Sequence, residues 1–187
     1  MIENQNAAKR TLQRIMALDI RSFFHYVSSI PYGYQDRSGA LHFSGDPDFT
    51  VQDYAFSSPE EIVKNNCCWC WDLAELIRLY CAEHQIPCKA YFMEYRSDAL
   101  HQTHTQVFLY DQETWSAAPD NCLGLAYGTP RFANLDDCVA WFTGMFTDYL
   151  KAVLKKQYDE SRLLVKPYSC TFSAGTSEEE YLSRIRL

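Results

Sequence analysis

The sequence predicts a single α+β domain in which helices flank an antiparallel sheet. Its 187 residues are enough for one hydrophobic core and too few for two comfortable ones. Hydrophobic residues make up 47% of the chain and aromatic residues 15%, proportions typical of a well-packed globular protein. Helical periodicity lies towards both ends of the chain, and three strand patterns follow one another in the middle. That order is typical of α+β proteins.

The first segment, residues 6–29, is predicted to be helical because its apolar residues recur at helical spacing. Asp19 interrupts the pattern and is expected to mark a bend. Residues 30–49 are rich in Gly, Pro and Asp, and we predict a long irregular loop there with little regular structure. Long loops in compact domains are commonly functional, so we expect this loop to wall a site.

A strong helix start follows at Ser58, which precedes Pro59 and two glutamates. Serine is a favoured cap, proline is favoured at the first helical position, and acids suit the first turn. This short helix is expected to end at the polar pair 65–66. A second helix is predicted over residues 69–84, with an apolar stripe along one side, and Pro87 ends it.

Three strands and a C-terminal region complete the predicted fold. The strands are expected at residues 89–95, 105–110 and 114–118, with a turn at 111–113. Beyond them we expect a long amphipathic helix over 135–158, a strand near 163–165 and a short helix over 177–185. The single domain then comprises N-terminal helices and a loop (1–57), a core (58–125), and a C-terminal helix and tail (126–187).

Charge and hydropathy narrow the possible partners. The net charge of −7, with no stripe of Lys and Arg, argues against nucleic acid. The N-terminus lacks the apolar core of a signal peptide, and no apolar run is long enough for a membrane helix. We therefore expect a cytoplasmic protein that does not bind a membrane. In a reducing compartment most of its eight cysteines are expected to be buried thiols rather than a disulfide framework.

One cysteine stands where a nucleophile is expected. The first turn of a helix stabilises a thiolate through its unpaired N–H groups and its dipole. Cys70 occupies that place on the 69–84 helix, whereas Cys67 and Cys68 fall in the preceding loop. We therefore expect the pKa of the Cys70 thiol to be depressed.

The matching base has to be a histidine on another element. The histidines are His25, His42, His84, His101 and His104. The first two fall in the first helix and in the loop. His84 lies at the far end of the helix that carries Cys70, roughly 20 Å away at 1.5 Å per residue, which excludes it. The remaining candidates, His101 and His104, open the second strand.

The expected hairpin gives a geometric test for an orienting acid. If the turn is centred on Gln112, strand positions pair when their numbers sum to about 224 in an unbulged ladder. His104 then lies opposite Asp120, whereas His101 faces Leu123. Cross-strand side chains are about 5 Å apart, which suits an imidazole–carboxylate contact. The arithmetic selects His104 and Asp120 together.

Five segments in this order resemble the transglutaminase-like superfamily of cysteine proteases. They are FHYVSSIPY at 24–32, SPEEIVK at 58–64, CWDLA at 70–74 followed by Ile86-Pro87, HTQVFLY at 104–110 and WSAAPD at 115–120. Together they span well over half the chain. Two positions depart from the family pattern. Cys68 replaces a glycine two residues before the nucleophile, and Gln85 replaces the glycine before Ile-Pro.

The resemblance implies a transglutaminase-like or papain-like core, with the nucleophile's helix packed on an antiparallel sheet. It also implies a triad of Cys70 as nucleophile, His104 as base and Asp120 as the group that orients the histidine. Such a triad attacks an amide or peptide bond and forms a thioester, which water or an amine then resolves. The expected substrate is a peptide, a protein or a small amide, and no cofactor is needed.

The oxyanion is expected to be held by the backbone N–H of Cys70 and by a second donor. Trp69, or the stretch that contains Tyr32, Tyr34 and Gln35, is the candidate source of that donor.

Two other kinds of function remain open. Cys67 and Cys70 form a C-x-x-C pair that is one half of a zinc ligand set. Cys81, Cys88 or Cys122, or the pair His101 and His104, would complete it. The same C-x-x-C pair is a thioredoxin-type redox motif, but such motifs follow a strand, whereas helix and loop are expected here. The other alternative is a non-catalytic binding module on the same fold, because a fold does not fix a function.

Overall fold

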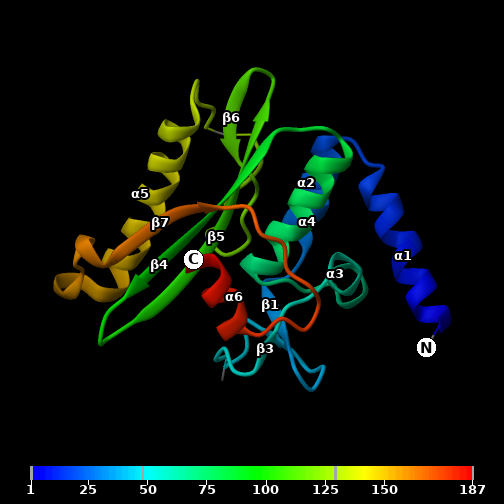
Figure 1. The fold of residues 1–187 in the computed structure, drawn as a ribbon, viewed down its shortest axis with the longest axis horizontal. Helices are drawn as coiled ribbons and strands as arrows, with labels where there is room; N and C mark the ends of the chain where they lie inside the picture. Colours follow the sequence, from blue (N-terminus) through cyan, green and yellow to red (C-terminus); the bar gives the residue numbers. More distant parts are fainter. Residues whose placement is uncertain (1, 48, 129, 187) are drawn as a thin grey trace.

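The computed structural model describes residues 2–47, 49–128 and 130–186, and it contains helices and two antiparallel sheets (Figure 1). The helices are α1 (Ile2–Met16), α2 (Ile20–Ser29), α3 (Pro59–Asn65), α4 (Cys70–Glu83), α5 (Leu135–Leu154) and α6 (Glu178–Arg186), with 3-10 turns at Lys155–Gln157 and Glu160–Arg162. The strands are β1 (Gly33–Asp36), β2 (Leu41–Phe43), β3 (Tyr54–Ala55), β4 (Cys88–Arg96), β5 (His101–Asp111), β6 (Thr114–Ala117) and β7 (Leu163–Tyr168). The smaller sheet has the order β2-β1-β3 and the larger one β6-β5-β4-β7. The predicted α+β class is confirmed.

The predicted bend at Asp19 is the junction between α1 and α2. The Asp19 carboxylate accepts hydrogen bonds from the backbone N–H groups of Arg21 and Ser22, and it therefore caps α2. Aspartate is a favoured cap because its side chain satisfies N–H groups that have no partner inside the helix.

The predicted irregular loop at 30–49 is wrong over much of its length, because β1 and β2 form a hairpin there. The Asp36 carboxylate accepts hydrogen bonds from the backbone N–H groups of Ser38 and Ala40, and these bonds fold the turn. The flanking residues then pair, with Tyr34 opposite His42. Gly, Pro and Asp mark a tight turn as readily as a long loop, and here a side-chain-capped turn brings two short strands together.

The helix starts that precede the core are close to those predicted. Ser58 caps α3 in a reciprocal capping box with Glu61, and Pro59 is its first residue. The next helix, α4, begins at Cys70, one residue after the predicted start. Asn66, between the two helices, adopts the left-handed conformation with φ 48°.

The larger sheet separates α4 from α5. Val107 and Leu109 of β5 pack in one cluster with Leu73 of α4, whereas Phe108 packs with Phe142 of α5. Successive residues of a strand point to opposite faces, so alternate residues of β5 pack against α4 and α5. Figure 1 shows α4 and α5 on either side of the long β4–β5 hairpin. The predicted packing of the Cys70 helix on an antiparallel sheet is therefore present.

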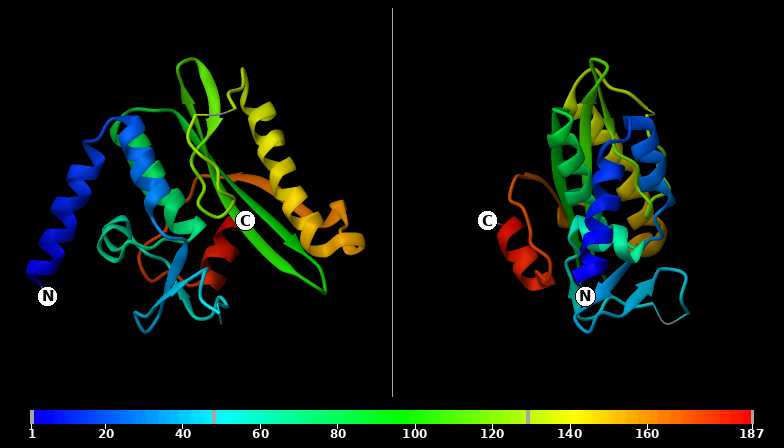
Figure 2. Two further views of the ribbon diagram at one scale, coloured as in Figure 1. Left: turned by 180° about the vertical axis from the view of Figure 1, so that it is seen from behind. Right: turned by 90° about the vertical axis from the view of Figure 1, so that its right-hand side faces the viewer.

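The C-terminal segment returns to the start of α4. β7 pairs antiparallel with β4, and the chain then crosses to α6. Tyr181 of α6 stacks on Trp71 with ring centroids 4.0 Å apart, and its hydroxyl bonds to that of Thr105 at 2.9 Å. Figure 2 shows α6 close to the start of α4. None of the helices in the described part of the chain is long and apolar enough to cross a bilayer.

Candidate active site

Cys70 is the first residue of α4, and a buried carboxylate holds this end of the helix. Asp72 Oδ2 accepts the backbone N–H of Trp69 at 2.9 Å. Asp72 Oδ1 accepts the backbone N–H of Ser57 at 2.9 Å and also the hydroxyl of Tyr54. One side chain therefore joins the helix start to the segment that precedes α3. Burial raises the pKa of Asp72 to about 7 although these three donors oppose the shift.

His104 reaches the site from β5, and Asp120 reaches it from the loop after β6. His104 Nε2 lies 2.5 Å from Asp120 Oδ2, but the carboxylate is not aligned for a linear hydrogen bond with the ring N–H. The imidazole also stacks against Phe142 and Phe146 of α5, with centroids 5.6 and 5.7 Å away. The exposed fractions of Cys70, His104 and Asp120 are 4%, 1% and 5%. The three predicted triad residues therefore meet in a site closed to solvent.

The register behind the prediction of Asp120 is wrong by one residue. The hairpin turns on two residues, Gln112 and Glu113, both with positive φ, and its pairs include Phe108–Ala117 and Asp111–Thr114. Such paired left-handed conformations define the two-residue turn that fits the twist of a hairpin. The strand also ends at Ala117, so Asp120 is not a ladder partner of His104. It is fixed instead by an isolated bridge with Leu125 and by the Leu123 N–H, which donates to Oδ1 at 2.7 Å.

The predicted depression of the Cys70 pKa is also wrong. Burial raises the pKa of the thiol, and the hydrogen bond and charge of His104 only partly offset that effect. The start of a helix does favour a thiolate, but here it lies among buried aromatic residues that exclude water. His104, not the helix alone, is therefore the group that stabilises the ionised sulfur.

The histidine keeps its proton because of Asp120. Burial opposes protonation of the ring, but the carboxylate outweighs it and raises the pKa of His104 well above its usual value. In turn, burial would raise the pKa of Asp120, but the charge of His104 lowers it below the ordinary range. Because these groups interact strongly, Cys70 and His104 titrate as a unit.

The residues predicted to supply an oxyanion donor divide into two groups. Tyr32 and Trp69 lie at the site and stack on each other with centroids 4.6 Å apart. Tyr34 instead donates its hydroxyl to the Thr50 carbonyl, and the Gln35 side chain bonds to Gly39 and Asn65. Neither Tyr34 nor Gln35 lines the cavity beside Cys70, so their proposed role is not supported.

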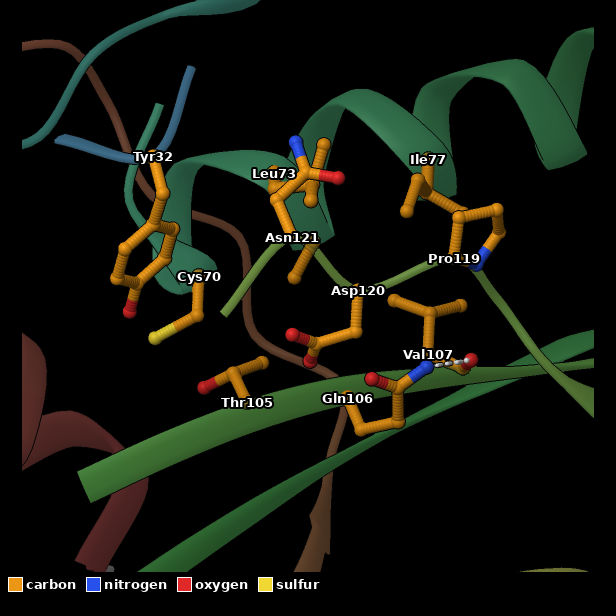
Figure 3. Close-up of a pocket in the computed structure, with 11 residues that line it drawn as sticks. Tyr32, Cys70, Leu73, Ile77, Thr105, Gln106, Val107, Pro119, Asp120 and Asn121 are labelled. Carbon is orange, nitrogen blue, oxygen red and sulfur yellow. Dashed lines mark hydrogen bonds between the residues drawn. The ribbon is translucent and has the colours of Figure 1, made fainter. Parts of the chain in front are cut away.

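A small cavity of about 10 Å³ lies between α4 and β5 beside Cys70, roughly the space of one water molecule. In Figure 3 the side chains of Tyr32, Cys70, Thr105 and Asp120 point towards one another around it. The backbone N–H of Cys70 belongs to the first helical turn, whose N–H groups have no partner within the helix. That geometry suits a carbonyl oxygen held at the start of α4.

Cys122 is a site residue that the sequence reasoning missed. Its thiol contributes to the pKa shifts of His104 and Tyr32, and it is exposed whereas Cys70 is buried. It also lines a groove of about 320 Å³ whose walls include aromatic residues. The aromatic residues are Tyr32, Phe49, Tyr54, Trp69, Trp71 and Tyr149. Its position two residues after Asp120 was the one signal available in the sequence.

The predicted zinc alternative joined Cys67 to Cys70. The Cys67 sulfur lies beside Gly33 of β1, in the smaller sheet. A Cβ built on Gly33 would be 3.0 Å from this sulfur. Over residues 2–47, 49–128 and 130–186, no group of three or more His, Cys, Asp or Glu side chains is placed to hold a metal ion.

Comparison with known proteins adds no assignment. No model of a protein family matches the chain. A search of curated proteins likewise finds no significant match.

Proposed function

We propose that this chain is a cysteine-dependent hydrolase or acyltransferase with a transglutaminase-like core, acting on an amide or peptide bond. The observation that carries the proposal is the meeting of Cys70, His104 and Asp120 from α4, β5 and the loop after β6. A thiol, an imidazole and a carboxylate in that sequence form the nucleophile, base and orienting group of acyl transfer.

The reaction begins from the Cys70 thiolate and the His104 imidazolium. The sulfur attacks the carbonyl carbon, and the oxyanion is held by the Cys70 N–H and a second donor from the Tyr32–Trp69 side. His104 gives its proton to the leaving nitrogen, and ammonia or an amine departs from a thioester. Neutral His104 then takes a proton from water or from an amine, which attacks the thioester. A carboxylic acid or a new amide leaves, and the thiolate–imidazolium pair is restored.

Asp120 supports both steps without touching the substrate. Its charge holds the proton on His104 and fixes which nitrogen faces the sulfur, because Nε2 is the atom beside Oδ2. The phenyl rings of Phe142 and Phe146 limit movement of the imidazole from the other side.

A non-catalytic binding module is the second candidate, and the burial of the triad favours it. Cys70 and His104 are 4% and 1% exposed, so a substrate reaches the sulfur only if the Tyr32, Trp69 or Cys122 side of the site moves. A binding module would use the aromatic groove and leave the sulfur covered.

Incubation with a library of peptides that carry both backbone amides and glutamine side chains distinguishes the cysteine enzyme from the binding module. Mass spectrometry detects cleavage, deamidation and coupling to an added primary amine in one experiment. We expect at least one of these products from the wild type and none from Cys70→Ala or His104→Ala. A product that persists in Cys70→Ala contradicts the proposal. Retention of peptides without any product supports the binding module.

Cys88→Ala is the matched control for this experiment. It removes another thiol, that of the first residue of β4, which follows the opposite end of α4 from Cys70. Its products should match those of the wild type. Circular dichroism of all variants shows whether the fold is kept.

A further inference from the structure

A second pair of thiols lies at the other end of α4. Cys81 is in the last turn of the helix and Cys88 is the first residue of β4. The turn between them is closed by the Ile86 N–H, which donates to the Cys81 carbonyl at 2.8 Å, and it passes through Gln85 with φ 56°. This turn brings the helix end and the strand start into one cluster of packed side chains.

The two cysteines pack in the same cluster and differ in exposure. Each thiol shifts the pKa of the other, and both cysteines are free in this structure. Cys81 is buried with an exposed fraction of 0%, whereas Cys88 is partly exposed. A buried thiol that donates to a more exposed one stabilises the exposed sulfur as the thiolate.

Charged side chains around Cys88 act in the same direction. The hydrogen bond from Cys81 lowers the pKa of Cys88, burial opposes it, and the charges of Arg78 and Lys89 lower it further, with Glu75 acting against them. Arg78 is held in place because its guanidinium donates to the carbonyls of Ser169 and Cys170 at 2.8 Å.

A groove gives small molecules access to this pair. It has a volume of about 480 Å³ and is lined by Cys88, Arg78, Glu75 and Phe172 among others. Exposure, a fixed cation and an adjacent second thiol are the features of cysteines that oxidise reversibly.

We propose that Cys88 and Cys81 form a reversible dithiol–disulfide site that hydroperoxides oxidise. The Cys88 thiolate attacks the outer oxygen of the peroxide, the O–O bond breaks, and a sulfenic acid forms. The released hydroxide or alkoxide takes a proton from solvent and leaves as water or an alcohol. The Cys81 thiol then attacks the Cys88 sulfur, the S–O bond breaks, and the hydroxyl group leaves as water with the Cys81 proton. Two electrons pass from the two sulfurs to the peroxide, and an external dithiol reverses the change.

This site is independent of the proposed acyl transfer. Cys81 and Cys88 lie at the far end of α4 from Cys70, and neither contributes to the groove beside His104. The disulfide would tie the end of α4 to the start of β4 across a short turn.

Trypsin makes the pair easy to follow, because Arg78 and Lys89 flank one peptide that carries both cysteines and no other. The protein is treated with hydrogen peroxide, its free thiols are blocked, and the 79–89 peptide is analysed by mass spectrometry. We expect it to lose two hydrogens and to regain them with dithiothreitol. Cys88 should react about ten times faster than Cys122, because Cys81, Arg78 and Lys89 stabilise its thiolate. An unchanged 79–89 peptide, or oxidation of Cys122 first, overturns the proposal.

Two variants identify the roles of the two sulfurs. In Cys81→Ser the partner thiol is gone, so Cys88 should stop at the sulfenic acid and be labelled by dimedone. In Cys88→Ser the buried Cys81 should stay reduced. Equal oxidation of Cys81 in the second variant would contradict the order of steps. Both variants are read by mass, so the result does not depend on whether the chain is an enzyme.

Discussion

The two ends of α4 each hold a cysteine in contact with a second functional group, and the two thiols differ in what controls them. At the N-terminal end Cys70 is buried among aromatic residues and faces His104. Beyond the C-terminal end Cys88 is partly exposed and faces Cys81 and Arg78. The pKa of Cys70 is raised although the helix dipole favours a thiolate, whereas the pKa of Cys88 is lowered without a helix N-terminus.

The comparison shows that burial and direct partners outweigh position on a helix. The dipole contributes roughly 0.3–1 kcal/mol at an exposed site, whereas burial of an ionised group costs more than that. Cys70 therefore depends on a charged partner, and His104 is that partner. Cys88 is partly exposed to water, and the neighbouring Cys81 thiol and the Arg78 cation lower its pKa.

The largest predicted difference between the two ends is in turnover. Cys70→Ala should lower the rate of acyl transfer by at least about 10⁴-fold, because no other group replaces the nucleophile. Cys88→Ala should leave the rate within about twofold, since it touches neither substrate nor His104. Product formation from any peptide that the wild type converts measures both. Comparable rates in the two variants would remove the distinction between the ends.

Asp72 makes the stability of the N-terminal end depend on pH. Its pKa is raised to about 7 in the folded protein, against 3.8 as its ordinary value. Between those values the folded state binds a proton that the unfolded state lacks, so stability falls as pH rises from about 4 to about 7. The contribution is roughly 4 kcal/mol at 1.4 kcal/mol per pKa unit.

Urea denaturation of the wild type and Asp72→Asn at several pH values tests this contribution. The variant loses a charge acceptor and is expected to be less stable overall, so the slopes are compared rather than the absolute stabilities. We expect a shallower decline, or none, in the variant. Parallel pH profiles would show that Asp72 titrates at its ordinary pKa.

Asp120→Asn should affect the Cys70 end by a smaller factor. The amide keeps an oxygen for the Leu123 N–H but loses the charge that raises the pKa of His104. We expect turnover to fall on the order of 10²-fold, within the usual range for impaired acid–base catalysis. Oxidation of Cys88 should not change. A variant with full turnover would remove Asp120 from the triad.

The smallest predicted effect concerns the turn between Cys81 and Cys88. Gln85 adopts φ 56°, a conformation that costs an L-residue about 1–2 kcal/mol. Glycine avoids that cost but loses about 0.5–1 kcal/mol of unfolded-state entropy, so Gln85→Gly should stabilise the protein by about 0.5 kcal/mol. Thermal unfolding of the two proteins measures the difference. A clear loss of stability would mean that the Gln85 side chain contributes more than its backbone conformation costs.

Much of the larger sheet and its helices could be predicted from local signals. The start of α3 depends on Ser58, Pro59 and Glu61, which act within one turn. The strand patterns of β4 and β5 need only alternation and aromatic content. The β1–β2 hairpin could not be predicted, because its strands are short and its turn depends on hydrogen bonds of the Asp36 side chain.

The candidate site was predicted in part for the wrong reason. The hairpin arithmetic selected His104 and Asp120, but the true register differs by one residue and the strand ends before Asp120. The pair meets because the chain after Ala117 folds back through the Asp120–Leu125 bridge. The contact of Cys122 with His104 depends on the same loop, and no local pattern reports it.

The most direct test of the central claim is the pH profile of iodoacetamide alkylation at Cys70, in the wild type and in His104→Ala. Because Cys67, Cys68 and Cys70 share a tryptic peptide, fragmentation spectra assign the modified sulfur. We predict that loss of His104 moves the Cys70 profile to higher pH and slows alkylation, while Cys88 keeps its profile. If the Cys70 profile is the same in both proteins, the histidine does not control the sulfur. The proposed thiolate–imidazolium pair would then be contradicted.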